Sequence, residues 1–375
     1  MSKHLKVEVK NGKIKEAINF FLIELLKKNL VSALLVPREL PSKDNVVQSL
    51  VSQPDELKNA DVFAPVLPVN SARIISEMTR LGSGKASVGA ILRSCEIRAL
   101  IELVKLKQAS LDNLLIIGID CPGTYSVKDY KALCQQGIYP EDELFKNLKK
   151  GMEDVRIREA CKVCEYPVPS NSDLTFGFLG VDFEKNIFFQ ANTSKGEKIL
   201  DRFSYLEFDG LKIREEFIFK YLKQKIKKRD ELFALTQKEV KGWENLISFF
   251  SACINCHNCM KVCPVCYCRE CFFESACFEF NGDKYLNWAK KKGSIKMPKD
   301  TALFHLGRMA HMATSCVGCG ACEEACPNNI PLLKVFKTVA HNVQEIFQYV
   351  PGKKLQEPLP LTTFKEDELQ RVGED

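Results

Sequence analysis

The sequence lacks any apolar run long enough to cross a membrane. Its longest apolar stretches, LVSALLV and NLLIIGI, have the length of buried strands, whereas a spanning helix needs about 18 to 20 residues. The opening residues, MSKHLKVEVK, also lack the apolar core of a secretory signal. We therefore expect a cytoplasmic protein without direct membrane insertion, so that any membrane attachment would go through a partner.

The sequence also lacks concentrated charge of one sign and a triphosphate-binding loop. Its formal net charge is +6, its lysines are scattered, and metal-bound thiolates would add negative charge. This argues against a nucleic-acid partner. The loop LGSGK differs from a triphosphate loop because Ala86 follows its lysine and Thr79 stands where the pattern requires glycine. The loop is expected to form a turn between a helix and a strand.

Cysteine, by contrast, is abundant, with 17 residues in a chain of 375. In a long chain without a signal core, cysteines clustered at metal-binding spacing indicate thiolate ligands in a reducing compartment. Two segments read C-x2-C-x2-C-x3-C-P, which is the spacing of ferredoxins that hold two cubane clusters. They contain Cys253, Cys256, Cys259 and Cys263 before Pro264, and Cys316, Cys319, Cys322 and Cys326 before Pro327.

In such ferredoxins the fourth cysteine of each motif ligates the other cluster. We therefore predict one cluster on Cys253, Cys256, Cys259 and Cys326, and a second on Cys316, Cys319, Cys322 and Cys263. Structural zinc sites also use thiolates, but they typically combine C-x2-C pairs with longer gaps or with histidines. The doubled motif with its prolines favours an iron–sulfur electron carrier over zinc.

The first half of the chain alternates helical and strand-like segments. Residues 14–30 predict an amphipathic helix, with Ile14, Ala17, Ile18, Phe21, Leu22 and Leu25 on one face. Further helices are expected at residues 70–81 and 94–108, and short apolar strands at 32–37, 88–92 and 113–120. This alternation predicts an α/β layer with a mainly parallel sheet, whose sites should lie at the carboxyl ends of the strands.

Four cysteines in this half lack the ferredoxin spacing. Cys95 and Cys121 each follow a predicted strand, and Cys161 and Cys164 form a C-x2-C pair. A lone C-x2-C pair suits a redox dithiol or half of a zinc site. The four together would instead suit one more cluster assembled from separate loops. The residues alone leave these alternatives open.

Two further segments are connections. One lies between the two halves of the chain, and the other lies between the two ferredoxin motifs. Residues 211–240 predict a charged linker helix with a solvated basic face, and with Ile213, Phe217, Leu222 and Ile226 at core spacing. The insert between the two motifs holds Cys266, Cys268, Cys271 and Cys277, at a spacing tight for a cluster loop. Three hypotheses remain for these cysteines: a fourth cluster, support of the neighbouring clusters, or burial as small apolar groups.

Five segments of the chain resemble the beta subunits of coenzyme F420-linked hydrogenases and dehydrogenases, most closely those of formate dehydrogenases. They are GAILRSCEIRAL, IGIDCPG, REACKVCEYPVPSNSDLTFGFLG, CINCHNCMKVCPVCYCREC and FHLGRMAHMATSCVGCGACEEACP. The resemblance covers most of residues 70–340. It implies that Cys95, Cys121, Cys161 and Cys164 hold a 4Fe-4S cluster beside FAD, which makes three such clusters in all. It also implies that the FAD exchanges a hydride with the deazaflavin.

The expected organisation follows from the motifs and the resemblance. Residues 1–210 should form an α/β (α+β) flavin and iron–sulfur domain, and 211–250 a helical linker. Residues 251–350 should form a helical two-cluster ferredoxin-like domain with a long insert, followed by a tail at 351–375. Near the flavin, Arg93, Glu96 and Arg98 are candidates for holding flavin or substrate, and the alternative is a surface salt-bridge set.

One segment departs from the family pattern. Family members usually carry Gly-Gly followed by Val-Thr-Ala-Leu near the flavin, whereas residues 11–22 read NGKIKEAINFFL. Because Lys13, Lys15 and Glu16 would crowd a phosphate-bearing ligand, we predict poor turnover of free deazaflavin. The competing hypothesis is that Gly12 suffices and that the two lysines attract the anionic tail of the deazaflavin.

The expected function is electron transfer within an oxidoreductase complex. The chain would pass electrons between a catalytic partner, such as a formate dehydrogenase alpha subunit or a hydrogenase-like subunit, and FAD or a heterodisulfide-reductase-like acceptor. The alternative is a flavin-free, polyferredoxin-like adaptor without catalysis of its own. The sequence sets neither the donor, the acceptor nor the direction of electron flow.

Overall fold

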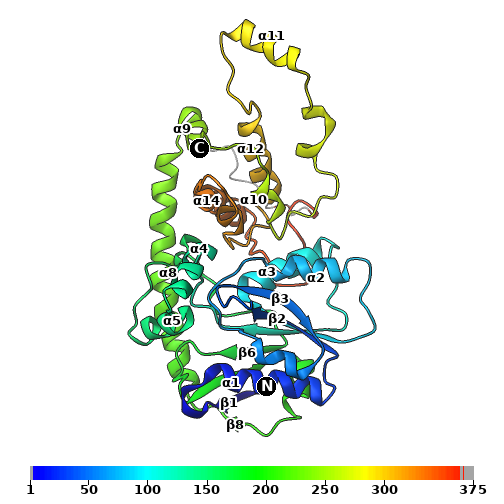
Figure 1. Ribbon diagram of the computed structural model, residues 1–375, viewed down its shortest axis with the longest axis vertical. Coiled ribbons are helices and arrows are strands. Elements are labelled where there is room, and N and C mark those ends of the chain that lie inside the picture. The colour runs from blue at the N-terminus through cyan, green and yellow to red at the C-terminus, as the bar shows by residue number, and fades with distance from the viewer. Residues whose placement is uncertain (1–2, 364–365, 367–375) are drawn as a thin grey trace.

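The computed structural model describes residues 3–363 and Glu366, so the end of the predicted tail lies outside the described residues. An α/β body carries the N-terminus, and a helical region with the two ferredoxin motifs sits on one side of it (Figure 1). The strands are β1 (His4–Glu8), β2 (Ala33–Glu39), β3 (Val46–Val51), β4 (Val88–Arg93), β5 (Leu114–Ile119), β6 (Leu174–Gly177), β7 (Asn186–Ala191) and β8 (Leu206–Glu207).

Helices alternate with the strands in the body and then take over the chain. Those of the body are α1 (Ile14–Lys27), α2 (Ser71–Thr79), α3 (Ser94–Lys105), α4 (Val127–Gln135), α5 (Pro140–Lys149), α6 (Glu159–Lys162) and α7 (Ser194–Leu200). The later ones are α8 (Leu211–Glu239), α9 (Trp243–Phe249), α10 (Asn258–Lys261), α11 (Gly282–Lys292), α12 (Thr301–Met312), α13 (Ala321–Glu324) and α14 (Leu332–Ile346). Within the described residues, no helix combines the length and the apolar character needed to span a bilayer.

The eight strands form one mixed sheet in the order β3-β2-β4-β5-β6-β7-β1-β8. The central strands β2, β4, β5 and β6 are parallel, as predicted. The prediction of a mainly parallel sheet is wrong for the rest, since β3, β7, β1 and β8 all pair antiparallel. Short connections explain the β2–β3 and β6–β7 pairs, because antiparallel neighbours need only a turn whereas parallel ones need a crossover.

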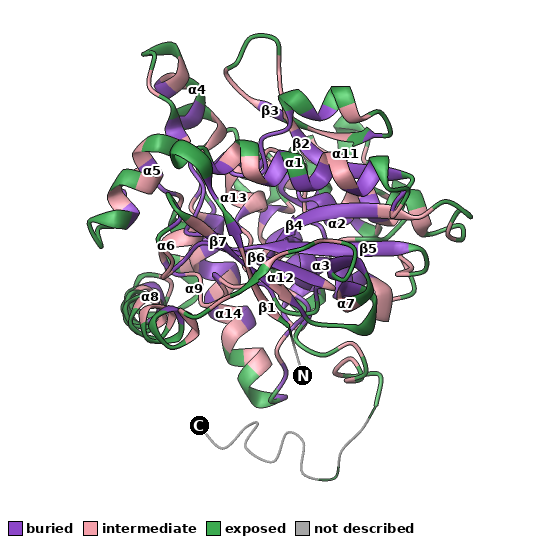
Figure 2. Cartoon of the chain, turned by 90° about the horizontal axis from the view of Figure 1, so that it is seen from below, coloured by how far each residue is buried: buried purple, intermediate pink, exposed green. Residues whose placement is uncertain are grey.

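Helices cover both faces of the sheet because its central strands are apolar on both sides. Successive side chains of β5 point to opposite faces. Ile117 thus joins the apolar core beneath α1, and Ile116 joins the core beneath α2 and α3. Figure 2 shows the buried strands enclosed by helices that expose their outer faces. The predicted face of α1 is confirmed at Ile14, Ile18, Phe21, Leu22 and Leu25, all of which are buried.

The long helix α8 lies along the outside of the body. The predicted inner face of this helix is confirmed at Phe217, which packs against the apolar core of the body, and is wrong at Ile213 and Ile226, which are exposed. Ile213 is 70% exposed, whereas the buried residues of the helix are Arg214, Lys225, Phe233 and Thr236. Arg214 forms two hydrogen bonds to Asp120, of 2.6 and 2.9 Å, at the end of β5. Breaking such a buried pair from one side costs about 3–5 kcal/mol. Charge pairing therefore anchors this part of the helix beside Cys121.

The ferredoxin part packs directly on the body. Short helices α10 and α13, one from each motif, contact each other, and Val265, Met312 and Val317 join the apolar core beneath α2 and α3. The chain after α14 returns to α3, where the backbone N–H of Gly352 donates to Glu102 over 2.8 Å. The insert bearing α11 projects away from both parts (Figure 1).

Candidate metal centres

The four cysteines of the first half line one pocket. Cys95 lies in the first turn of α3, just after β4, and Cys121 lies just after β5. Because β4 and β5 are parallel neighbours, their carboxyl ends meet at one edge of the sheet. Cys161 in α6 and Cys164 just beyond it complete the pocket lining, together with Arg158, Tyr166, Tyr221 and Lys225. The expectation that sites lie at the strand ends holds for Cys95 and Cys121.

Cys161 has the surroundings expected of a thiolate. Burial opposes its ionisation, but the charge of Arg158 and hydrogen bonds from Thr124 outweigh burial, so the pKa of Cys161 lies below its usual value. The Thr124 backbone N–H donates to the sulfur over 3.4 Å, and the Arg158 guanidinium does so over 3.8 Å. Donors of this kind stabilise a metal-bound sulfur.

The ferredoxin cysteines have electrostatic neighbours in both motifs. Burial raises the pKa of Cys259 to about 11, and beyond the opposing effect of Arg308 the neighbouring thiols that raise it further are Cys253, Cys256 and Cys326. Burial likewise raises the pKa values of Cys316, Cys319 and Cys322, and each also has Cys263 as a neighbour. These neighbours agree with the crossed ligand assignment, which stays a prediction.

The donors at these sites are cysteine sulfurs, which ligate both zinc ions and iron–sulfur clusters. The doubled C-x2-C-x2-C-x3-C-P motif, together with its prolines, is the feature that favours clusters.

The first group of cysteines adjoins the ferredoxin part. Cys319 lines the same pocket as Cys95 and Cys121, and its charge helps burial to raise the pKa of Cys95. Close backbone approach makes this possible: a Cβ on Gly320, which has φ +74°, would lie 2.5 Å from the Cβ of Ala160 in α6. The three thiol groups therefore follow one another from the body into the ferredoxin part.

Two side chains of α12 contact the cysteines of the first motif, and spacing alone did not assign them this place. His305 stacks on Phe250 with ring centroids 4.0 Å apart. Its Nε2 also lies 3.3 Å from the Cys253 sulfur. Arg308 donates to the Cys259 sulfur over 3.0 Å. A signal was present, because Phe304, Arg308 and Met312 recur at the four-residue interval of a buried helix face.

The insert cysteines are only partly gathered. Cys266 is close to the ferredoxin cysteines: burial raises its pKa to about 12, and neighbouring thiols including Cys263 and Cys271 add to this. Cys271 lies 3.5 Å from the Met260 sulfur, while Cys268 and Cys277 are exposed. The fourth cluster stays a hypothesis.

Arg93, Glu96 and Arg98 are all buried, so the alternative of an exposed salt-bridge set is wrong. Glu96 caps α3 by accepting from the backbone N–H groups of Arg93 and Ser71, each over 2.9 Å. Arg98 donates to the Pro351 carbonyl over 2.8 Å and lies over the Tyr166 ring. These contacts organise the start of α3, and a role toward flavin stays a prediction.

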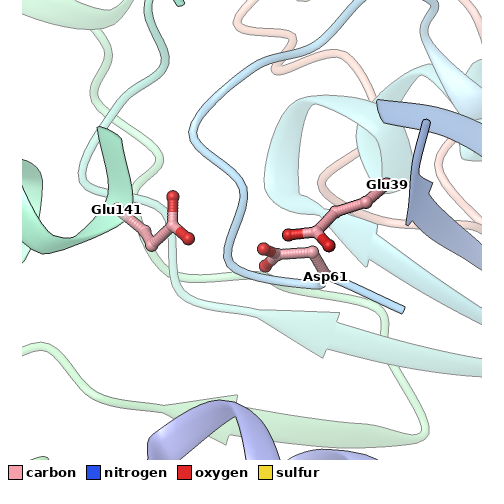
Figure 3. A group of neighbouring side chains, drawn as sticks. All are labelled: Glu39, Asp61 and Glu141. Atoms are coloured by element: carbon pink, nitrogen blue, oxygen red, sulfur yellow. The ribbon is translucent and has the colours of Figure 1, made fainter. Parts of the chain in front are cut away.

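A cavity of about 760 Å³ opens at the N-terminal end of α1. It is lined by Gly12, Lys13, Lys15, Lys58, Asp61, Glu141, Lys146, Lys149 and Lys150, among others. At its floor, Asp61 and Glu39 both bind the ammonium group of Lys15, and Glu141 points toward them from α5 (Figure 3). Lys13 in turn pairs with Glu16 over 2.7 Å.

Taken together, the thiol groups and the fold define an iron–sulfur electron-transfer protein. Residues 249–330 match the family described as 4Fe-4S dicluster domain. Residues 86–213 match the family that describes the C terminus of the beta subunit of coenzyme F420 hydrogenase/dehydrogenase.

Relatives agree with these matches over most of the chain. The F420-dependent formate dehydrogenase subunit beta of Methanocaldococcus jannaschii is 26% identical over 361 residues, covering 88% of this chain and 89% of that protein. The F420-dependent formate dehydrogenase 1 subunit beta of Methanococcus maripaludis is 26% identical over 377 residues, covering 92% of each. A chain from the xenon-derivatised F420-reducing NiFe hydrogenase complex of Methanosarcina barkeri aligns with TM-score 0.47 and 13% identity, covering 63% of this chain and 92% of that one.

The resemblance drawn from the sequence is therefore confirmed. Over most of its length the chain is similar to oxidoreductase subunits, namely the beta subunits of F420-dependent formate dehydrogenases, and residues 86–213 match the corresponding family.

Proposed function

We propose that this chain carries electrons through three 4Fe-4S clusters, one in the body and two in the ferredoxin part. The observation that carries the proposal is that Cys319, a ferredoxin cysteine, lines the pocket of Cys95, Cys121, Cys161 and Cys164. Cluster sites that share a wall would allow electrons to pass between them without leaving the protein. The ligands would be Cys95, Cys121, Cys161 and Cys164, and the two crossed ferredoxin sets.

The residues around the first pocket would hold its cluster and exclude water. Thr124 and Arg158 donate to the Cys161 sulfur, and the Tyr221 hydroxyl fixes the loop after Cys121 by donating to the Pro122 carbonyl over 2.9 Å. Lys225, buried in α8, donates to the Cys161 carbonyl over 2.8 Å. Hydrogen bonds and burial of this kind set the potential of an iron–sulfur site.

FAD is proposed as the second cofactor, and the cavity at α1 is its candidate site. Its volume lies in the range of cofactor pockets, roughly 300–1,000 Å³, and its lysines and the start of α1 suit an anionic group. When bound, a flavin couples two-electron hydride chemistry to one-electron steps. The Gly12 backbone and Lys150 would contact its phosphates, since Lys58, Lys146 and Lys149 are already paired with Asp55, Glu143 and Glu184.

The same cavity supports the prediction that free deazaflavin is a poor substrate. Lys13 and Lys15 were the groups that would attract its anionic tail, and both are already paired with carboxylates. The relatives are named as F420-dependent formate dehydrogenase subunits, so the proposed partner is a catalytic formate dehydrogenase or hydrogenase-like subunit. A heterodisulfide-reductase-like acceptor and a cytoplasmic location complete the proposal.

The competing function is a flavin-free electron-wiring adaptor. Anaerobically purified protein should release FAD that can be measured by its fluorescence, and the adaptor hypothesis predicts none. Reduction assays with reduced F420, NADH and dithionite-reduced ferredoxin would then identify the donor. Rapid bleaching of the flavin by reduced F420 alone would contradict the prediction of poor deazaflavin turnover.

A further inference from the structure

Arg308 lies inside the ferredoxin part rather than at its surface. It is 3% exposed and sits on α12 between the rings of Phe304 and Phe336. Its guanidinium donates to the Cys259 sulfur and to the Cys259 carbonyl, each over 3.0 Å. These two hydrogen bonds hold the positive charge of Arg308 beside one cysteine of the first motif.

The charge of Arg308 has no carboxylate partner. Among the residues that the structure describes, no carboxylate oxygen lies within 4.0 Å of its nitrogens, and its buried Nε has no hydrogen-bond partner. An arginine stays charged in proteins, and an uncompensated buried charge costs several kcal/mol. Arg214 pairs with Asp120 and Lys105 with Glu102. Arg93 and Arg98 are buried without a carboxylate partner, but their guanidinium groups donate to backbone carbonyls, whereas Arg308 donates to a cysteine sulfur.

The rings that flank Arg308 also border the second motif. Phe304 and Phe336 belong to an apolar core against which Cys322 and Cys326 pack. Cys259 belongs to one crossed set and Cys322 to the other. Arg308 therefore lies in a core that borders both ferredoxin cluster sites.

We propose that Arg308 is the electrostatic partner of both ferredoxin clusters and holds their reduction potentials at less negative values. The inference rests on the proposed function. A cubane ligated by thiolates is anionic, and each electron that it accepts adds negative charge. A fixed buried cation stabilises the reduced form more than the oxidised form, because the attraction grows with the charge of its partner. Hydrogen bonding to the sulfur acts in the same direction.

The test is a redox titration of the reconstituted full chain, followed by electron paramagnetic resonance. Arg308→Met keeps much of the aliphatic stem and removes the charge, and we expect it to move at least one ferredoxin cluster to a more negative midpoint potential. Arg308→Lys keeps the positive charge but loses the planar guanidinium that donates to both the sulfur and the carbonyl of Cys259. The shift in midpoint potential should therefore be smaller than in Arg308→Met. Lys105→Met is the matched control, since it removes a buried cation that contacts Tyr349 and Glu102, and it should leave the ferredoxin potentials unchanged.

Iron content separates this inference from the proposed function. Absence of ferredoxin clusters from the wild-type protein would refute the proposed function itself. Wild-type potentials in a fully loaded Arg308→Met variant would overturn the role of Arg308. If Arg308→Met loses iron, Arg308→Lys decides: retained iron with a small shift supports the charge, and equal loss of iron shows that packing alone matters.

Discussion

At the scale of single residues, buried cations lie next to cysteine sulfurs at several places in this molecule. Arg158 contacts Cys161, Arg308 contacts Cys259, and Lys337 lies near Cys164 and Cys316, where burial is the main cause that lowers its pKa. Cysteine spacing was readable because the ferredoxin loop needs fixed intervals along the chain. The cations were not readable, since each reaches its sulfur only after distant segments have packed.

The ligand assignment predicts very different effects for cysteines of similar chemistry. Cys256→Ser and Cys319→Ser should each remove one cluster and destabilise the ferredoxin part, because metal binding there contributes directly to folding. Cys134→Ser is the control. Cys134 lies on α4 beside an apolar core that Cys161 also borders, but it does not line the pocket of the first four cysteines, so its replacement should keep full iron. Iron loss in Cys134→Ser would contradict the assignment.

The position of Glu141 in the α1 cavity leads us to expect that it destabilises the folded chain in a pH-dependent way. Burial, with a contribution from the charge of Asp61, raises its pKa from 4.5 to about 7. The folded chain therefore binds this proton more tightly than the unfolded chain does, and its contribution to stability falls as pH rises from about 4.5 to about 7. Glu141→Gln should raise the free energy of unfolding by about 1–3 kcal/mol at pH 8, and by less than about 1 kcal/mol at pH 5.

Urea unfolding at the two pH values would check this prediction. Asp142→Asn, one residue further along α5 and exposed, is the matched charge control and should show no such dependence. An equal gain at both pH values in Glu141→Gln would refute the linkage.

At the scale of elements, apolar periodicity predicted the helices and strands whose bounds depend on residues close together in the sequence. The bounds of α1, α3, β4 and β5 follow from apolar periodicity, and these elements place Cys95 and Cys121. The inner face of α8 was mispredicted at Ile213 and Ile226, because Arg214 and Lys225 are buried instead by their partners Asp120 and Glu153 on other segments. Apolar spacing cannot reveal a face held by charge pairs.

The return of the chain to α3 predicts a sharp glycine effect. A Cβ on Gly352, which has φ +69°, would lie 2.3 Å from the Arg98 carbonyl oxygen. Gly352→Ala should therefore cost at least about 3 kcal/mol, combining a left-handed backbone penalty with a steric clash. Gly137→Ala is the control, because Gly137 has φ +73° but nothing within 4 Å of the added Cβ, and it should cost about 1–2 kcal/mol. Similar midpoints for the two variants in urea unfolding would contradict this packing.

At the scale of the whole molecule, the decisive feature is the seating of the ferredoxin part on α3 and α6. The sequence predicted an α/β part followed by a ferredoxin-like part, but nothing in it indicated that Cys319 would share a pocket with Cys95. That contact depends on Gly320 meeting Ala160 and on Val317 joining the core beneath α3. It turns two cysteine-rich halves into one continuous series of sites.

The most direct test of this series is the iron content of anaerobically reconstituted protein. Three cubane clusters on twelve cysteines predict about twelve iron atoms per chain. Cys121→Ser should lower the count to about eight and leave the two ferredoxin signals in electron paramagnetic resonance intact. A reproducible count of about eight in the wild-type chain would contradict the account by removing the cluster of the first pocket, and a count of about sixteen would assign a further cluster to the insert cysteines.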